Sequence, residues 1–295
     1  MLALAPLIIY PVFLMNVLCF ALFASAFNLL LGYTGLLSFG HAVFFGMSAY
    51  VTGHAAKVWE LPPEIAILAG TATATLLGVV MGLVAIRRQG IYFAMTTLAL
   101  AQMIYFFCLQ APFTGGEDGI QAIPRGKMFG LLDLQDTMVM YFVVWAIFLG
   151  GFLLIYRIIH SPFGKVLAAI RENEPRTISL GYRVNRYKLM AFILSAGLAG
   201  LAGGTRAIVF QLATLTDVHW STSGEIVLMT LLGGLGTVIG PFIGSALIVT
   251  LQNYLAQIGE WVTVVQGVIF ILCVLTFRRG IVGEIGLQIR KRIPK

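Results

Sequence analysis

Residues 28–46 read NLLLGYTGLLSFGHAVFFG, a stretch in which glycines and polar side chains interrupt an otherwise apolar sequence. Gly32, Gly35, Gly40 and Gly46 weaken a helix, and their clustering argues against one continuous helix. Backbone groups left unpaired are not tolerated in hydrocarbon, so a break at membrane depth has to face protein or a water-filled cavity. The stretch therefore predicts a broken helix that faces the inside of a membrane protein.

The composition of the whole chain is that of an integral membrane protein. Of its 295 residues, 59% are hydrophobic and 11% are charged, and the mean hydropathy is +0.94. A soluble domain carries about a quarter of charged residues. Six apolar runs have the length that crosses a bilayer as a helix. They are residues 7–31, 65–86, 91–111, 138–156, 189–205 and 261–277.

Two further apolar regions, residues 36–50 and 226–258, complete the expected set. The second is too long for one ordinary crossing, and glycines and a proline interrupt it. It is predicted to go in and come back, as two short crossings or a re-entrant pair that meets near Gly240 and Pro241. The fold class expected is all-α and polytopic, with about 8–10 transmembrane segments, broken or re-entrant helices included.

Basic residues predict the orientation. Residues 87–88, 157–188 and 278–295 contain most of the 19 Lys and Arg residues and few acids. Such a bias places these three regions in the cytoplasm and the N-terminus outside. The formal charge of +7 then reflects topology and anionic lipid rather than a nucleic-acid partner, for which no basic soluble module is present.

The two interrupted regions indicate a transport pathway. LLGGLGTVIGPFIG at 231–244 shares an LG-x-x-G spacing with LGYTG at 31–35, and paired broken segments in two halves of a chain mark the pathway in repeat-built transporters. The alternative is that the glycines only allow close helix packing and that His41 makes an interhelical hydrogen bond. The residues expected to line the pathway are Asn28, Gly32, Tyr33, Gly35, Ser38, His41, Phe44, Thr96, Thr97, Gly233 and Gly236.

The sequence also allows two other classes of function, an intramembrane hydrolase and a channel or ion-coupled carrier. Ser38 and His41 stand three residues apart, so an intramembrane serine hydrolase is conceivable, although a nucleophile also needs an oriented base and an oxyanion site. A channel or ion-coupled carrier would show charged residues on its pathway. We expect none here, because Arg206 is expected to snorkel at an outer end and Glu225 to close a Thr222-x-x-Glu225 capping box. Energy then has to come from another chain.

The loop at 157–188 is predicted to contain a short amphipathic helix. Ser161 is its expected N-cap, Pro162 its first residue, and Pro175 its end. Phe163, Val166, Leu167 and Ile170 share one face at helical spacing. The helix either lies on the inner leaflet or docks in a groove of a soluble partner through these side chains.

Several motifs, in order, resemble the permease subunits of bacterial branched-chain amino acid ABC transporters. They are NLLLGYTGLLSFGHAVFFGMSAY, GIYFAMTTLALAQMIYFF, TGGEDGI, SPFGKVLAAIRENEPRTISLGYRVNRYKLMAFILSAGLAGLAGG, and GSALIVTLQNYL after LLGGLGTVIGP. The chain is closer to the type with the TGGxxGI external loop. The resemblance implies one transmembrane permease domain over residues 1–295, in the bacterial inner membrane, with a coupling loop at 157–188 and a basic cytoplasmic tail at 278–295.

The resemblance also implies partners. A second permease subunit, two cytoplasmic ABC ATPases and a periplasmic substrate-binding protein would complete the complex, with ATP and Mg on the ATPases. This chain has no G-x-x-x-x-G-K-[ST] phosphate loop, and we expect it to be no enzyme. No CxxC or His cluster accompanies its three cysteines, so neither cofactor nor metal is expected.

Residues carry over from the family by position. The external loop corresponds to Thr114, Gly115, Gly116 and Gly119. The ATPase-coupling region corresponds to Ser161, Pro162, Phe163, Gly164, Val166, Leu167, Ile170, Arg171, Glu172 and Gly181. The substrates implied are leucine, isoleucine and valine, and a pathway without fixed charge would equally suit urea or a short amide.

Overall fold

The computed structural model describes residues 10–130, 132–255, 264–265, 267–268, 271 and 280–284, and this part of the chain is predominantly helical. The longer helices are α1 (Pro11–Thr34), α2 (His41–Lys57), α3 (Pro63–Ala85), α4 (Ile91–Gln110), α5 (Thr137–His160), α8 (Val184–Phe210), α9 (Trp220–Gly233) and α10 (Gly240–Leu255). The shorter elements are η2 (Pro112–Thr114), α6 (Pro162–Glu172), α7 (Glu174–Ser179), η3 (Leu215–Asp217), β1 (Ile120–Gln121), β2 (Lys127–Met128), β3 (Leu132–Asp133) and β4 (Leu212–Ala213). The all-α polytopic fold predicted from the sequence is confirmed.

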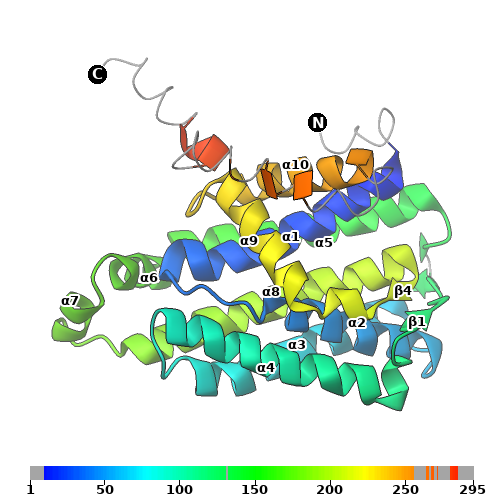
Figure 1. Ribbon diagram of the computed structural model, residues 1–295. Helices are drawn as coiled ribbons and strands as arrows, with labels where there is room; N and C mark the ends of the chain where they lie inside the picture. Colours follow the sequence, from blue (N-terminus) through cyan, green and yellow to red (C-terminus); the bar gives the residue numbers. More distant parts are fainter. Residues whose placement is uncertain are drawn as a thin grey trace.

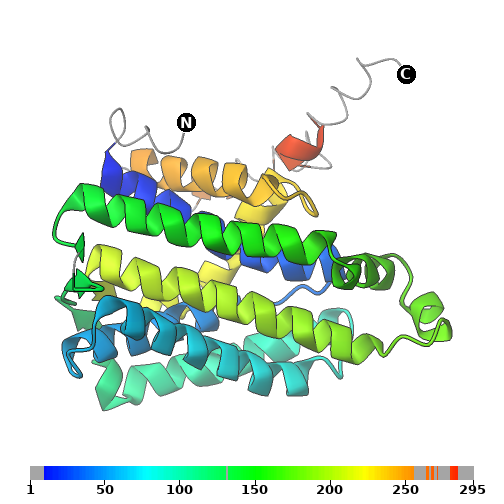
Figure 2. The ribbon, with the colours of Figure 1, turned by 180° about the vertical axis from the view of Figure 1, so that it is seen from behind.

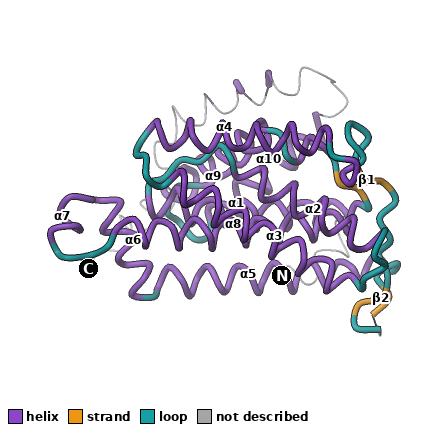
Figure 3. The backbone as a smooth tube through the Cα atoms, turned by 90° about the horizontal axis from the view of Figure 1, so that it is seen from below, coloured by secondary structure: helices purple, strands orange, loops and turns teal. Residues whose placement is uncertain are grey.

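Helices α1 and α8 form the centre of the bundle. In their most apolar windows 89% of α1 and 72% of α8 are buried, against 33% of α3, 28% of α4 and 33% of α5. All five are long and apolar enough to cross a membrane. Helices α4 and α5 lie on opposite flanks of this centre (Figure 3). The outer faces of α3 and α4 carry exposed large apolar side chains, as lipid contact requires.

The two ends of the bundle differ in structure. At one end, which we call the strand end, β1 pairs antiparallel with β4 and β2 with β3. At the other, the α6 end, α6 and α7 extend beyond the long helices (Figures 1 and 2). Gln89 Nε2 donates to Glu174 Oε1 over 3.2 Å, and the Lys188 ammonium lies 2.7 Å from the same oxygen. The basic regions at 87–88 and 157–188 therefore share one end, as the charge pattern predicts.

The boundaries of one expected segment are corrected. The segment expected at 36–50 is not helical at its start, since α2 begins only at His41 and continues to Lys57. Gly40 is the N-cap of α2, so residues 36–39 precede the helix. The amide of Ala42, in the first turn, has no intrahelical acceptor and donates to Ser223 Oγ on α9.

The apolar region at 226–258 is interrupted, as predicted, and its described part belongs to two short helices. Helices α9 and α10 pack against each other, and a turn at 234–239 joins them. Gly240, expected at the meeting point, is the first residue of α10. Of the crossing expected at 261–277, all but a few residues lie outside the described part of the chain.

The predicted amphipathic helix is α6. The Ser161 side chain accepts a hydrogen bond from Gly164 N, so Ser161 is the N-cap, as expected. Pro175 does not end this helix, which stops at Glu172. Instead, Asn173 caps a second short helix, α7, whose first turn contains Pro175. A proline lacks the amide that a first turn leaves unpaired anyway, so it fits there.

Candidate functional site: a broken helix and its partners

The break predicted at the start of the chain lies between α1 and α2. Gly35 ends α1 in a left-handed conformation with φ of 75°, and its amide donates to Leu31 O. A side chain at this φ is strained, which explains glycine here. From Gly35 the chain runs back toward the middle of the bundle before α2 begins (Figure 1).

The connecting segment 35–40 is irregular and poorly paired, with a turn at Phe39 and Gly40. The structure shows no hydrogen bond between the backbone of Leu36 or Leu37 and any other described residue. Thr97 and Ser38 provide side-chain partners nearby, since Phe39 N donates to Thr97 Oγ1 over 3.3 Å and Gly40 N to Ser38 Oγ over 3.3 Å. Such backbone in a membrane protein has to face a hydrated space or another protein.

A cavity of about 480 Å³ lies along this segment. Its wall combines the segment itself, the first half of α4 and the start of α9. The lining residues are Gly35, Leu36, Leu37, Phe39, Gly90, Ile91, Ala94, Met95, Leu98 and Trp220. The cavity is therefore largely apolar, and the backbone of the irregular segment forms part of its wall.

The two interrupted regions of the sequence meet in space. Asn28, on α1, donates from Nδ2 to Thr237 O over 2.8 Å, and its Oδ1 accepts from Gly236 N over 3.1 Å. The Tyr33 hydroxyl donates to Gly236 O over 2.9 Å. The predicted relation between the LGYTG and LLGGLGTVIG motifs thus corresponds to direct contact between the end of α1 and the turn at 234–239.

His41 is a buried structural contact between helices. Its Nε2 lies 2.8 Å from Ser195 Oγ, and Ser195 Oγ donates over 2.6 Å to Ala26 O. Because the serine proton goes to Ala26, Nε2 has to donate, so His41 is not placed as a base toward this serine. Ser38 Oγ instead accepts from Gly40 N. The structure brings Ser38 and His41 into no contact of the kind that a hydrolase needs.

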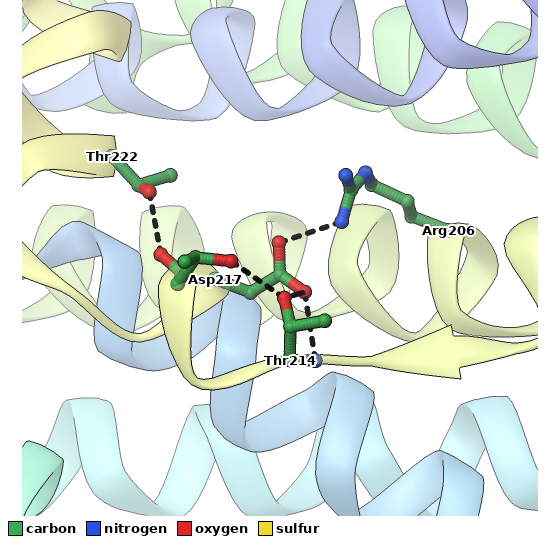
Figure 4. A network of polar contacts seen from close by, with 5 residues as sticks. Arg206, Thr214, Asp217 and Thr222 are labelled. Atoms are coloured by element: carbon green, nitrogen blue, oxygen red, sulfur yellow. Dashed lines mark hydrogen bonds and ion pairs between the residues drawn. The ribbon is translucent and has the colours of Figure 1, made fainter. Parts of the chain in front are cut away.

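An ion pair that the sequence analysis missed links α8 to the segment before α9 (Figure 4). Arg206 Nη1 lies 2.6 Å from Asp217 Oδ1, while Asp217 Oδ2 accepts from the backbone and hydroxyl of Thr214. The guanidinium also lies over the rings of Phe20, Phe45 and Phe210. The expectation that Arg206 snorkels to solvent is therefore wrong. Its guanidinium is held by Asp217 and by aromatic rings of the same chain.

The expected capping box at Thr222 and Glu225 is also wrong. His219 caps α9 through Nδ1, which accepts from Ser221 N, whereas Thr222 Oγ1 donates to Thr216 O. The Glu225 side chain lies close to Gln252 on α10. The capping box of this region is that of Thr214 and Asp217, around η3.

The TGGxxGI loop lies at the strand end, away from the broken helix. Thr114 Oγ1 closes the loop by donating to the carbonyl of Ala111 over 2.7 Å. Gly115, Gly116 and Gly119 all have positive φ, and a Cβ at Gly119 would overlap the carbonyl of Ala213. The glycines thus allow a tight loop to pack beside β4.

The apolar face of α6 is occupied within this chain. Leu167 and Ile170 are buried, and α6 contacts α1, α5 and α8. Phe163 and Val166 pack at the edge of the same core, and the Phe163 ring stacks on Tyr187 at 5.7 Å. Leu167 and Ile170 are therefore not free to enter a groove of a partner, so that detail of the docking prediction is corrected.

The remaining predicted residues are spread over the fold. Phe44 is in the core beside His41, Gly233 packs α9 against α10, and Gly181 forms the turn after α7. Thr96 lies on the other face of α4 from Thr97, close to Arg87 and Arg88. The structure therefore forms three separate groups from the predicted residues: Asn28, Gly32, Tyr33 and Gly236 around the turn; Gly35, Ser38 and Thr97 along the 35–40 segment; and His41 with Phe44 in the core. Thr96, Gly181 and Gly233 lie apart from these groups.

Among the described residues no group of His, Cys, Asp and Glu could hold a metal ion. Taken together, the long apolar helices, the interrupted α1–α2 connection and the α9–α10 pair define a multi-pass membrane protein with a broken-helix core.

Comparison with known proteins identifies the family. Residues 11–274 match the family described as branched-chain amino acid transport system / permease component, so the chain belongs to that family. It is a multi-pass protein of the bacterial inner membrane.

Two relatives carry the same name, high-affinity branched-chain amino acid transport system permease protein LivM. The protein from Escherichia coli strain K12 is 25% identical over 282 residues, and that from Salmonella typhimurium is 26% identical over 282 residues. Each alignment covers 86% of this chain, which spans 65% of the length of these relatives.

A ribose import permease protein, RbsC of Bacillus subtilis, is 30% identical over 196 residues, covering 61% of this chain and 58% of that protein. No solved structure matches the chain.

Proposed function

We propose that the chain is a permease subunit of an ATP-driven importer that moves leucine, isoleucine and valine across the membrane. Family membership supports the class, and the names of the two LivM relatives support the substrate. The observation that carries a translocation role is the irregular segment at 35–40, in which the backbone of Leu36 and Leu37 is unpaired beside a cavity of about 480 Å³. Residues 1–295 would form one permease domain, with the coupling loop at 157–188 and the basic tail at 278–295 in the cytoplasm.

The cavity suits the apolar side chain of such a substrate. Its wall is formed by aliphatic and aromatic side chains, which remove a branched aliphatic group from water. Free backbone amides and carbonyls at 36–37 offer partners to an ammonium and a carboxylate. A sugar would leave many hydroxyls unpaired on these walls, which disfavours ribose as the substrate.

The rest of the transporter would come from other chains. We propose a second permease, which together with this one encloses the pathway, two ATPases that bind ATP and Mg, and a periplasmic binding protein. The exposed surfaces of α6 and α7, including Lys165, Glu172 and Arg176, would meet an ATPase, since the opposite face of α6 is already buried.

Uptake by the reconstituted complex tests the substrate. The proteoliposomes contain both permeases and the ATPases, with the binding protein added outside. They should accumulate labelled leucine only when ATP is enclosed in the lumen, on the side of the ATPases. Labelled ribose and urea are the competing substrates, and each is assayed with its own candidate binding protein. ATP-dependent uptake of ribose or urea without uptake of leucine would reject the substrate assignment.

Cysteine modification tests the pathway separately from the substrate. Leu37→Cys and Met95→Cys place thiols at the cavity, and Phe106→Cys places one on the exposed outer face of the same helix, α4. A membrane-permeant maleimide should block uptake by the two cavity variants, and excess substrate should slow their labelling. The Phe106→Cys variant and the parent chain, treated alike, should keep transporting. Full uptake by a completely labelled Leu37→Cys protein would remove this cavity from the pathway.

A further inference from the structure

Arg171 lies where α6, the end of α1 and the α9–α10 turn meet. It belongs to the last turn of α6, and its Nη1 donates to the carbonyl of Gly32, 139 positions earlier. That carbonyl is one of those that a helix end leaves without an intrahelical partner, because Leu36 has left the helix. A cation at a helix C-terminus is also favoured by the helix dipole.

The same guanidinium lies against the turn at 234–239. A methyl group added to Gly236 would be 3.1 Å from Arg171 Nη1 and 3.3 Å from Gly32 O. Gly236 is also the residue that Asn28 and Tyr33 hold through its amide and its carbonyl. We call this set of contacts, formed by Asn28, Gly32, Tyr33, Arg171, Gly236 and Thr237, the clasp.

Helix α6 connects the clasp to the exposed surface at this end of the bundle. Leu167 and Ile170 fix α6 on the bundle, while the opposite side of the helix is exposed. A partner that pushes or pulls the exposed side therefore acts through Arg171 on both interrupted membrane segments at once. Gly35, whose added Cβ would lie 3.4 Å from Arg171 Cγ, is the first residue of the segment that lines the cavity.

We propose that Arg171 is a positioning residue that transmits movement of α6 to the end of α1 and to the α9–α10 turn, and so links ATP hydrolysis to opening of the pathway. This inference rests on the proposed function. Arg171, an exposed residue at the end of α6, then acts through its contacts with Gly32 and Gly236, and the ATPase is retained by other residues of α6 and α7. A residue that only caps α1 would stabilise the helix without changing the amount of substrate moved for each ATP.

The test compares Arg171→Met, Arg171→Lys and Lys127→Met in the reconstituted complex. Lys127 is the control, since its side chain is exposed at the strand end, away from the surface proposed to meet an ATPase, and makes no polar contact with a described residue. Arg171→Met should keep its ATPases and basal hydrolysis, while the substrate moved per ATP falls severalfold. Arg171→Lys, which can still donate to one carbonyl, should recover part of the ratio.

Two results would overturn the inference. One is a wild-type transport ratio in Arg171→Met, and the other is loss of the ATPases from that variant, which would make Arg171 a docking contact. Absence of uptake by the wild-type complex would instead count against the proposed function.

A second measurement needs neither substrate nor partner. In the purified chain, amide exchange at 234–239 should accelerate severalfold in Arg171→Met and in Tyr33→Phe, while exchange at β1 and β4 stays unchanged. Unaltered exchange in the turn would show that Arg171 does not hold it, and would reject the inference whatever the complex transports.

Discussion

The clasp and the Arg206–Asp217 pair both join distant segments with polar contacts, but they do so with different chemistry. In the clasp, neutral side chains and one arginine bond to backbone carbonyls and an amide at a turn. In the pair, an arginine meets a carboxylate that is 7% exposed and that two groups of Thr214 also bind. Bonds to a turn can be exchanged one by one, whereas separation of this partly buried ion pair leaves a buried carboxylate without its cation.

This difference suggests two roles in one bundle. The pair at the strand end joins α8 to the segment before α9, and the clasp at the α6 end joins α1 to the 234–239 turn through contacts that, in our proposal, shift together. In our proposal, the end of α1 and the 234–239 turn move, whereas the Arg206–Asp217 pair keeps the opposite end of the bundle in place. The predictions below test this contrast, in order of decreasing expected effect on stability.

The largest effect is expected from Asp217→Ala. Arg206 would keep its charge among Phe20, Phe45 and Phe210 without a carboxylate. The loss of one partner costs about 3–5 kcal/mol in a fully buried pair, and less is expected here because the Arg206 side chain is 24% exposed. Thermal unfolding in detergent, followed by size-exclusion chromatography, measures the change. The double variant Arg206→Leu/Asp217→Leu should be more stable than Asp217→Ala, because no charge is left behind. A melting temperature of Asp217→Ala equal to that of the parent would remove the distinction between the two clusters.

An intermediate effect is expected from Asn28→Ala. This change removes two hydrogen bonds to the turn, worth about 0.5–1.5 kcal/mol each, and leaves the amide of Gly236 without its acceptor. Asn28→Asp is the matched control, since it keeps the acceptor and loses the donor. The Asn28→Ala protein should melt at a lower temperature than the parent but above Asp217→Ala. A larger loss than that of Asp217→Ala would make the clasp, rather than the ion pair, the fixed point.

The smallest effect is expected from Gln89→Ala. Its hydrogen bond to Glu174 is 3.2 Å long and exposed, and exposed substitutions of this kind change stability by less than about 0.5 kcal/mol. Glu174 keeps Lys188 as its partner. An unchanged melting temperature would show that the link between the 87–90 turn and α7 is peripheral to both clusters. A clear loss would mean that the α6 end is more rigid than the clasp alone implies.

Much of the fold could be predicted because hydropathy and charge act over whole segments. The crossings that correspond to α1, α3, α4, α5 and α8 were predicted within a few residues, and the broken pair at 226–258 followed from its length and glycines. The start of α2 was misplaced because its first turn is completed by Ser223, a residue of α9. No local pattern in the sequence carries that information.

The candidate site was predictable only in part, for a related reason. Glycines and Asn28 marked where the helices break, and those breaks do meet in the structure. Arg206 and Asp217, however, are eleven residues apart and were interpreted separately, one as snorkelling and the other not at all. Ser195 carries no signal beyond being a serine in an apolar run, and only the packing of α8 on α1 and α2 shows that it pairs with His41.

The bond from Ala42 N to Ser223 Oγ, 2.9 Å long and spanning 181 positions, has a consequence for how the protein is made. During synthesis α1 and α2 enter the membrane long before Ser223, the acceptor for Ala42 N, has been made. At about 5–20 residues per second the delay is roughly 10–40 s. For that time the start of α2 has an open amide in or near lipid, and a chaperone, water or the translocation machinery has to satisfy it. Maturation of the amino-terminal half thus waits for the carboxy-terminal half.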